Sequence, residues 1–283
     1  MRIPNPSKII LFATLYGCGV TGFNHEGKSL YQPEDIFDCS ASREFITTYR
    51  YLRHPETNLG HKAAVKLAHE VSAGCDQAAS RFIQISEIVR NSGLGARDAF
   101  AMAKPFAITT PIKTKAFVTI FKSAYLKKGL DLTLQDALNI ALALSIEYEG
   151  DPHQALEDYH GIVEYCLDPG ELAMPRANCA KLAKDITIFG EKSNLHTLEP
   201  FKDMMEFARD EDGPKIPTFQ AIKLSKELME VSPVAVYNFM EAYRFLTDEH
   251  EFKRKPAIAH ARRVAHKTFK KASEVQGERP KGT

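Results

Sequence analysis

The residues best suited to chemistry form two small groups. His61 and His69 lie eight residues apart in a segment of helical periodicity, and His153, Asp158 and His160 cluster near a helix-start signal. Two helical positions eight residues apart are too distant to share one metal ion. The sequence contains no His-Glu-x-x-His, Cys-x-x-Cys or Gly-x-Ser-x-Gly motif and no nucleotide-binding glycine motif. We therefore expect no catalytic residue, no metal ligand and no cofactor.

The N-terminus carries a different signal. Arg2 and Lys8 precede an eight-residue apolar run, residues 9–16, which ends at Gly17 and Cys18. The run is too short to span a bilayer, which takes roughly 20 apolar residues. Its order of charged, apolar and small residues is typical of a secretory signal. The alternative is a buried first strand or helix with an ordinary thiol.

The tetrapeptide Leu15-Tyr16-Gly17-Cys18 resembles the lipobox of bacterial lipoproteins, although Tyr16 is bulkier than the usual small residue. The resemblance implies that residues 1–17 are a signal peptide and that Cys18 is acylated and becomes the new N-terminus. Gly19, rather than Asp, implies sorting to the outer membrane, facing the periplasm. Residues 18–35 would then be a lipid-anchored tether.

The rest of the chain is organised by a repeat. A small residue recurs with similar neighbours at Ala64, Ala99, Ala137, Cys179, Ala221 and Ala261. Each is followed by an apolar residue three positions later and a second small residue four positions later, which places them on one helical face. An apolar residue followed by Gly, Thr or Pro precedes each copy, although the sixth copy slips by one to Pro256. Such spacing predicts stacked helical hairpins.

Each copy contains two helical stretches separated by a short turn. Large apolar residues line the first stretch, and small residues line the second. The fold class is therefore all-α, an α-solenoid of about six antiparallel hairpins in a right-handed superhelix. Its period and form resemble HEAT or armadillo repeats. We expect one repeat domain, residues 36–272, followed by a flexible tail, residues 273–283.

Cysteine placement adds two predictions. A lipidated Cys18 leaves four of the five cysteines, and an exported chain meets an oxidising compartment. An antiparallel hairpin brings Cys39 close to Cys75, and Cys166 and Cys179 flank one hairpin turn. We therefore predict disulfides Cys39–Cys75 and Cys166–Cys179; the alternative is four buried thiols.

Charge is unevenly distributed although the net charge is only +1. Residues 251–283 hold ten Lys and Arg against three Glu. The basic side chains expected to face solvent there are Arg262, Arg263, Lys267, Lys270 and Lys271. They either keep a terminal repeat soluble or bind an anionic partner, such as lipid head groups or an acidic protein. The export signal disfavours nucleic acid.

Two functions remain open at this point. A solenoid offers an extended surface for a protein or peptide, which predicts a non-enzymatic scaffold of the bacterial cell envelope, tethered to the membrane through its lipid. The alternative is that six hairpins close into an (α/α)6 toroid, a hydrolase acting on glycan or peptidoglycan.

Overall fold

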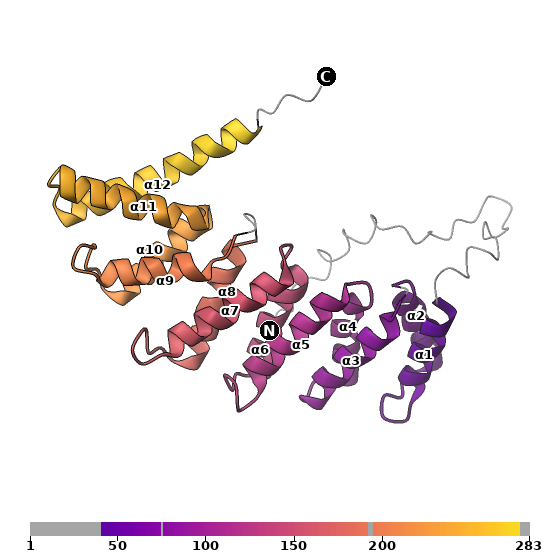
Figure 1. Cartoon of the computed structure of the whole chain (residues 1–283). Helices are drawn as coiled ribbons and strands as arrows, with labels where there is room; N and C mark the ends of the chain where they lie inside the picture. The colour runs from indigo at the N-terminus through magenta and orange to yellow at the C-terminus, as the bar shows by residue number, and fades with distance from the viewer. Residues whose placement is uncertain (1–40, 75, 192–194, 278–283) are drawn as a thin grey trace, which may run out of the picture. The chain divides into compact units, whose positions relative to one another are not determined.

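The computed structural model describes residues 41–74, 76–191 and 195–277, with side chains described as far as residue 267. These residues form α-helices joined by turns, with two π-helical turns and no strand (Figure 1), so the predicted all-α class is confirmed. The helices are α1 (Ala41–Arg53), α2 (His61–Ser72), α3 (Ala78–Asn91), α4 (Ala96–Ala107), α5 (Pro111–Tyr125), α6 (Leu134–Leu142), η4 (Ala143–Glu147), α7 (Pro152–Leu167), α8 (Arg176–Phe189), α9 (Leu198–Arg209), α10 (Thr218–Val231), α11 (Pro233–Arg244), η5 (Phe245–Glu249) and α12 (Arg254–Gly277).

The chain divides into two compact units at Thr109 and Thr110. Unit 1 holds hairpins α1–α2 and α3–α4, and unit 2 holds α5–α6, α7–α8, α9–α10 and α11–α12. Within each unit, odd-numbered helices also pack on the next odd-numbered helix and even-numbered helices on the next even-numbered one. Each unit is therefore a solenoid-like stack with an odd layer and an even layer. The superhelical sense stays a prediction.

All six hairpin turns share one backbone conformation and one closing hydrogen bond. In all six hairpins the residue three positions before the second helix has a left-handed backbone, with φ between 39° and 104°. These residues are Asn58, Gly93, Asp131, Ala173, Lys215 and Glu251. The next residue donates its backbone N–H to a carbonyl near the end of the first helix: Leu59 to Leu52, Leu94 to Val89, Leu132 to Ala124, Met174 to Cys166, Ile216 to Ala208 and Phe252 to Leu246 (2.9–3.2 Å). This bond satisfies a carbonyl that the helix end would otherwise leave unpaired.

The second helix of each hairpin starts at a fixed distance from this turn. Six residues after the left-handed position lies a fully buried small residue: Ala64, Ala99, Ala137, Cys179, Ala221 and Ala257. Each donates its N–H to the carbonyl four residues earlier, at 2.9–3.0 Å. We call this residue the anchor. Small side chains here and four residues later, all buried, allow the two helices to approach closely.

The anchor corrects the predicted register of the sixth copy. The sequence pattern placed it at Ala261, whereas the turn places it at Ala257, one helical turn earlier. Because α12 carries a small residue every four positions, Ala257, Ala261 and Ala265, the pattern alone cannot fix the phase. Val264 on this helix is 44% exposed.

Aromatic side chains fill the interface between the layers. The most deeply buried rings of the odd helices are Phe82, Phe117, Phe121, Tyr159, Phe201, Phe239 and Tyr243. They form chains of ring contacts such as Phe117 on Phe121, at 5.8 Å between centroids. Large side chains on one layer and small ones on the other let the surfaces interdigitate, as the sequence predicts.

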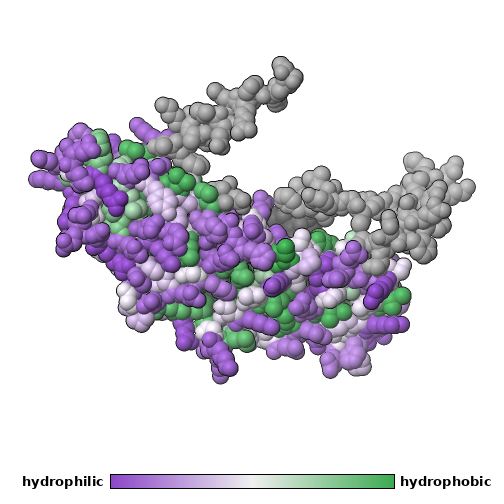
Figure 2. All heavy atoms as spheres, viewed as in Figure 1, coloured by the Kyte–Doolittle hydropathy of each residue, from purple (hydrophilic) through white to green (hydrophobic). Residues whose placement is uncertain are grey.

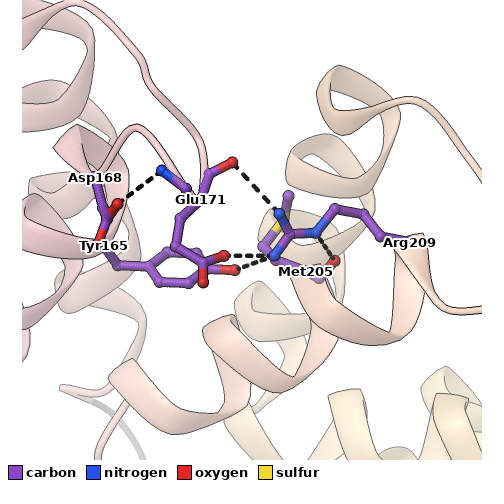
Figure 3. A network of polar contacts seen from close by, with 6 residues as sticks. Tyr165, Asp168, Glu171, Met205 and Arg209 are labelled. Carbon is purple, nitrogen blue, oxygen red and sulfur yellow. Dashed lines mark hydrogen bonds and ion pairs between the residues drawn. The ribbon is translucent and has the colours of Figure 1, made fainter.

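An arginine also ties neighbouring hairpins together in the odd layer. Arg209, at the end of α9, donates to the Glu171 carboxylate (2.6 Å) and the Tyr165 hydroxyl (3.0 Å) of the α7–α8 hairpin (Figure 3). This hydrogen bond lowers the pKa of Glu171 and keeps it ionised. In unit 1, Arg90 of α3 likewise directly follows the residue whose carbonyl accepts the closing hydrogen bond of its hairpin. It donates to the Glu56 carbonyl in the preceding turn (3.1 Å).

Candidate functional site

The candidate site is a groove along three successive even helices of unit 2. One hollow of about 580 Å³ lies between α8 and α10, and a second of about 480 Å³ lies between α10 and α12. Glu227 borders both. The lining residues, which define the even-layer groove, are Asn178, Lys181, Leu182, Asp185, Phe189, Phe219, Ile222, Lys223, Lys226, Glu227, Glu230, Ala259, Arg262, Arg263, His266 and Lys267.

The floor of the first hollow is apolar. Phe189 and Ile222 are half-buried there, and Phe219 at the start of α10 is 77% exposed. On the face drawn in Figure 2, hydrophobic side chains form small groups among polar ones. An aromatic ring left this exposed beside a hollow is available to pack against a ligand.

Ion pairs cross the even layer at a constant place in the repeat. In three hairpins the sixth residue after the anchor is acidic and pairs with the fifth residue after the next anchor, which is basic. The pairs are Glu70 with Lys104 in unit 1 (2.7 Å), and Asp185 with Lys226 (2.7 Å) and Glu227 with Arg262 in unit 2. The corrected anchor Ala257 is what brings Arg262 into this series.

Glu227 is the most heavily engaged carboxylate of the groove. Burial favours its neutral form, but hydrogen bonds from Arg262 and His266, together with their charges, outweigh that effect and lower its pKa. The His266 ring nitrogen lies 3.3 Å from the carboxylate. Glu227 is therefore ionised, as a member of an ion pair rather than a proton donor.

Four cations of the groove have no carboxylate within 4 Å among the described residues: Lys181, Lys223, Arg263 and Lys267. In total, six lysines and arginines line the groove against three carboxylates. Three residues of the predicted anionic-partner site, Arg262, Arg263 and Lys267, line the second hollow together. The side chains of Lys270 and Lys271 lie outside the described residues.

Three members of the histidine groups, His61, His69 and Asp158, make structural contacts. His61 hydrogen-bonds the Tyr49 hydroxyl through Nδ1 (3.0 Å), and the His69 ring packs on Phe45 at 4.6 Å. Asp158 is buried and accepts the backbone N–H of Thr197 (2.8 Å), so it holds the chain entering α9.

Of the cysteine predictions, Cys18, Cys39 and Cys75 fall outside the described residues. Cys166 and Cys179 are buried free thiols. Burial, and then the hydrogen bond between the two thiols, raises the pKa of Cys166. The two groups are thus neighbours, and the Cys166–Cys179 disulfide stays a prediction.

The sequence reasoning missed the α8–α10 half of the groove. Lys181 and Lys223 each lie two residues after an anchor, and Phe219 lies two before one. Reading the charges in repeat register would have shown that these lysines share a face. That they border a hollow depends on the packing of successive hairpins.

Comparison with protein-family models, with curated proteins and with solved structures finds no match. Within the described ranges, no cluster of three His, Cys, Asp or Glu side chains is arranged to hold a metal ion. A search of the same ranges finds no helix with the length and apolar character needed to cross a membrane.

Proposed function

We propose that the protein is a non-enzymatic scaffold that binds a polypeptide along the even-layer groove. One observation carries this proposal. The hollow between α8 and α10 and the hollow between α10 and α12 adjoin at Glu227, so together they extend over three successive even helices. A site that continues from hairpin to hairpin suits an extended chain better than a compact small molecule.

The chemistry of the groove supports binding rather than hydrolysis. Asp185 and Glu227 are both in ion pairs, and the pKa of Glu227 is lowered. A glycoside hydrolase needs a carboxylic acid with a raised pKa facing a second carboxylate. Cations neutralise both Asp185 and Glu227, which favours the scaffold over a hydrolase.

A site-specific photo-crosslinker tests the proposal. Phe219→p-benzoylphenylalanine places the reactive group in the groove, and Phe245→p-benzoylphenylalanine places it on η5, where the side chain is 49% exposed. With a synthetic random-sequence peptide library, we expect crosslinked peptides at position 219 and few at 245. Equal yields at the two positions would refute a groove-specific scaffold.

The cellular setting is a separate part of the proposal. The lipobox-like tetrapeptide supports an outer-membrane lipoprotein anchored through Cys18, which would present the groove to the periplasm. Intact-mass measurement of protein from a bacterial envelope should show loss of residues 1–17 and an acylated Cys18. Cys18→Ala should block processing or release the protein from the membrane. An unmodified Met1 terminus would contradict the lipoprotein assignment.

The same material tests the disulfide. Export to an oxidising compartment should join Cys166 to Cys179, whose thiols already contact each other. Non-reducing peptide mapping should recover the two cysteines in one crosslinked peptide pair. Recovery of both cysteines as free thiols would contradict the predicted disulfide.

A further inference from the structure

We infer that the ligand of the even-layer groove is an acidic peptide whose carboxylates recur about every three residues, with an apolar side chain between the first two. This inference rests on the proposed scaffold function and names the chemistry of its partner. Three features of the described residues carry it: the unpaired cations, the apolar floor, and the spacing of the helices.

The unpaired cations set the charge of the ligand. Lys181 on α8, Lys223 on α10 and Arg263 on α12 line the groove without a carboxylate partner within 4 Å in the described part of the chain. The first two are exposed at the same repeat position, two residues after the anchor. Each can therefore donate hydrogen bonds to a carboxylate of a ligand without breaking an existing ion pair.

The end of the ion-pair series points the same way. In hairpins α7–α8 and α9–α10 the sixth residue after the anchor is acidic, Asp185 or Glu227, and pairs with the next hairpin. In α12 that position is Arg263, which has the opposite charge. The series thus ends on a base, with Lys267 one helical turn further along the same hollow.

The spacing of the helices sets the spacing of the carboxylates. Packed helices lie about 8–10 Å apart, and an extended peptide advances about 3.3 Å per residue. One step from α8 to α10, or from α10 to α12, therefore spans about three residues. Carboxylates at that interval would reach Lys181, Lys223 and Arg263 in turn, and an apolar side chain between the first two would contact Phe219 and Ile222.

The three carboxylates of the groove argue against a polyanion. Asp185, Glu227 and Glu230 lie among the cations and would repel a continuous line of phosphates. Separated peptide carboxylates can match the cations while avoiding these acids. Charge complementarity with an apolar anchor therefore favours an acidic peptide over nucleic acid or an anionic lipid surface.

Fluorescence anisotropy with labelled synthetic peptides tests the inference, using the intact folded chain at about 0.15 M ionic strength. The probe carries three Glu at three-residue spacing and one Leu between the first two. Its controls have the same composition with the Glu adjacent, or Lys in place of Glu. We expect the spaced acidic peptide to bind about tenfold more tightly than either control.

Matched protein variants place the binding in the groove. Lys223→Glu should weaken binding of the acidic peptide about tenfold and improve binding of the Lys peptide. Lys66→Glu is the control, because Lys66 is exposed at the same repeat position on α2 in unit 1, and it should leave the affinity unchanged. Circular dichroism checks that both variants stay folded.

The outcomes separate this inference from the proposed function. If neutral or basic peptides bind as tightly as acidic ones and still crosslink at position 219, the acidic specificity is wrong and the scaffold stands. If no peptide crosslinks there, both fail. Tighter binding to anionic lipid vesicles or single-stranded RNA than to the spaced peptide also overturns the inference.

Discussion

The turns of the hairpins and the surface of the even layer follow opposite rules. All six turns share the left-handed residue, the closing hydrogen bond and the buried anchor. The even-layer surface differs from hairpin to hairpin: the residue two positions after the anchor is lysine on α2, α8 and α10 (Lys66, Lys181, Lys223) but Ala101 on α4, Asn139 on α6 and Ala259 on α12.

This contrast separates the constraints of folding from those of binding. A turn must satisfy backbone groups and seat a small side chain, so its geometry tolerates little change. A solvent-facing position carries no such demand, so its side chain can be set by a ligand. Substitutions in the turns should therefore alter stability, and substitutions in the groove should alter binding.

The largest effect is expected at Gly213, in the α9–α10 turn. A β-carbon there would lie 1.7 Å from the Phe207 carbonyl oxygen, so the backbone would have to shift. Gly213→Ala should lower the free energy of unfolding by about 3 kcal/mol in urea denaturation. Gly60→Ala is the control, because nothing lies within 4 Å of its added β-carbon. Similar losses for both would mean that the turn is not tightly constrained.

A smaller loss is expected when the anchor is enlarged. Ala221 is fully buried, so Ala221→Leu should overpack the α9–α10 hairpin and cost about 2 kcal/mol. Lys223→Leu, two residues later on the exposed face, should change stability by less than about 0.5 kcal/mol. If the two variants melt at the same temperature, the anchor does not control helix packing.

A gain in stability is expected at Ala173, which has a left-handed backbone (φ 49°) and a β-carbon. Ala173→Gly removes the steric cost of that conformation and should stabilise the protein by about 1 kcal/mol. Asn58→Gly should gain less, since asparagine tolerates the left-handed region better than alanine. Destabilisation by Ala173→Gly would contradict the shared turn geometry.

The smallest effect concerns the Glu227–Arg262 pair on the groove surface. Because the pKa of Glu227 is lowered on folding, the pair contributes stability above the ordinary glutamate pKa and loses it as the pH falls through the lowered value. Arg262→Gln should therefore cost about 0.5 kcal/mol at neutral pH and nothing once Glu227 is protonated. A cost that does not depend on pH would assign the effect to packing of the arginine stem.

The sequence predicts the parts of this protein that depend on local periodicity. The small residues at Ala64, Ala137 and Ala221 repeat with a helical environment, and all are buried as expected. The phase of the last copy is wrong because α12 offers several equivalent alanines. The left-handed Glu251 and the hydrogen bond from Phe252 to Leu246 distinguish them.

The site was only half predictable for a similar reason. Arg262, Arg263 and Lys267 stand out as a basic cluster in one stretch of sequence. Lys181, Lys223 and Phe219 do not cluster along the chain, since they come from different hairpins. Their common surface arises from the stacking of α8 on α10, and no local pattern encodes the hollow between them.

The turn also sets where the gene can change length. The carbonyl and amide that close it are five residues apart in the α3–α4 hairpin and eight apart in the α5–α6 hairpin, yet the anchor always follows the left-handed residue by six. Length variation is thus absorbed on the upstream side of that residue, while the downstream side keeps a fixed phase. Insertions and deletions should accumulate between the end of the first helix and the left-handed position. Duplication of a whole hairpin from one such point to the next would keep the register of both the odd and the even helices.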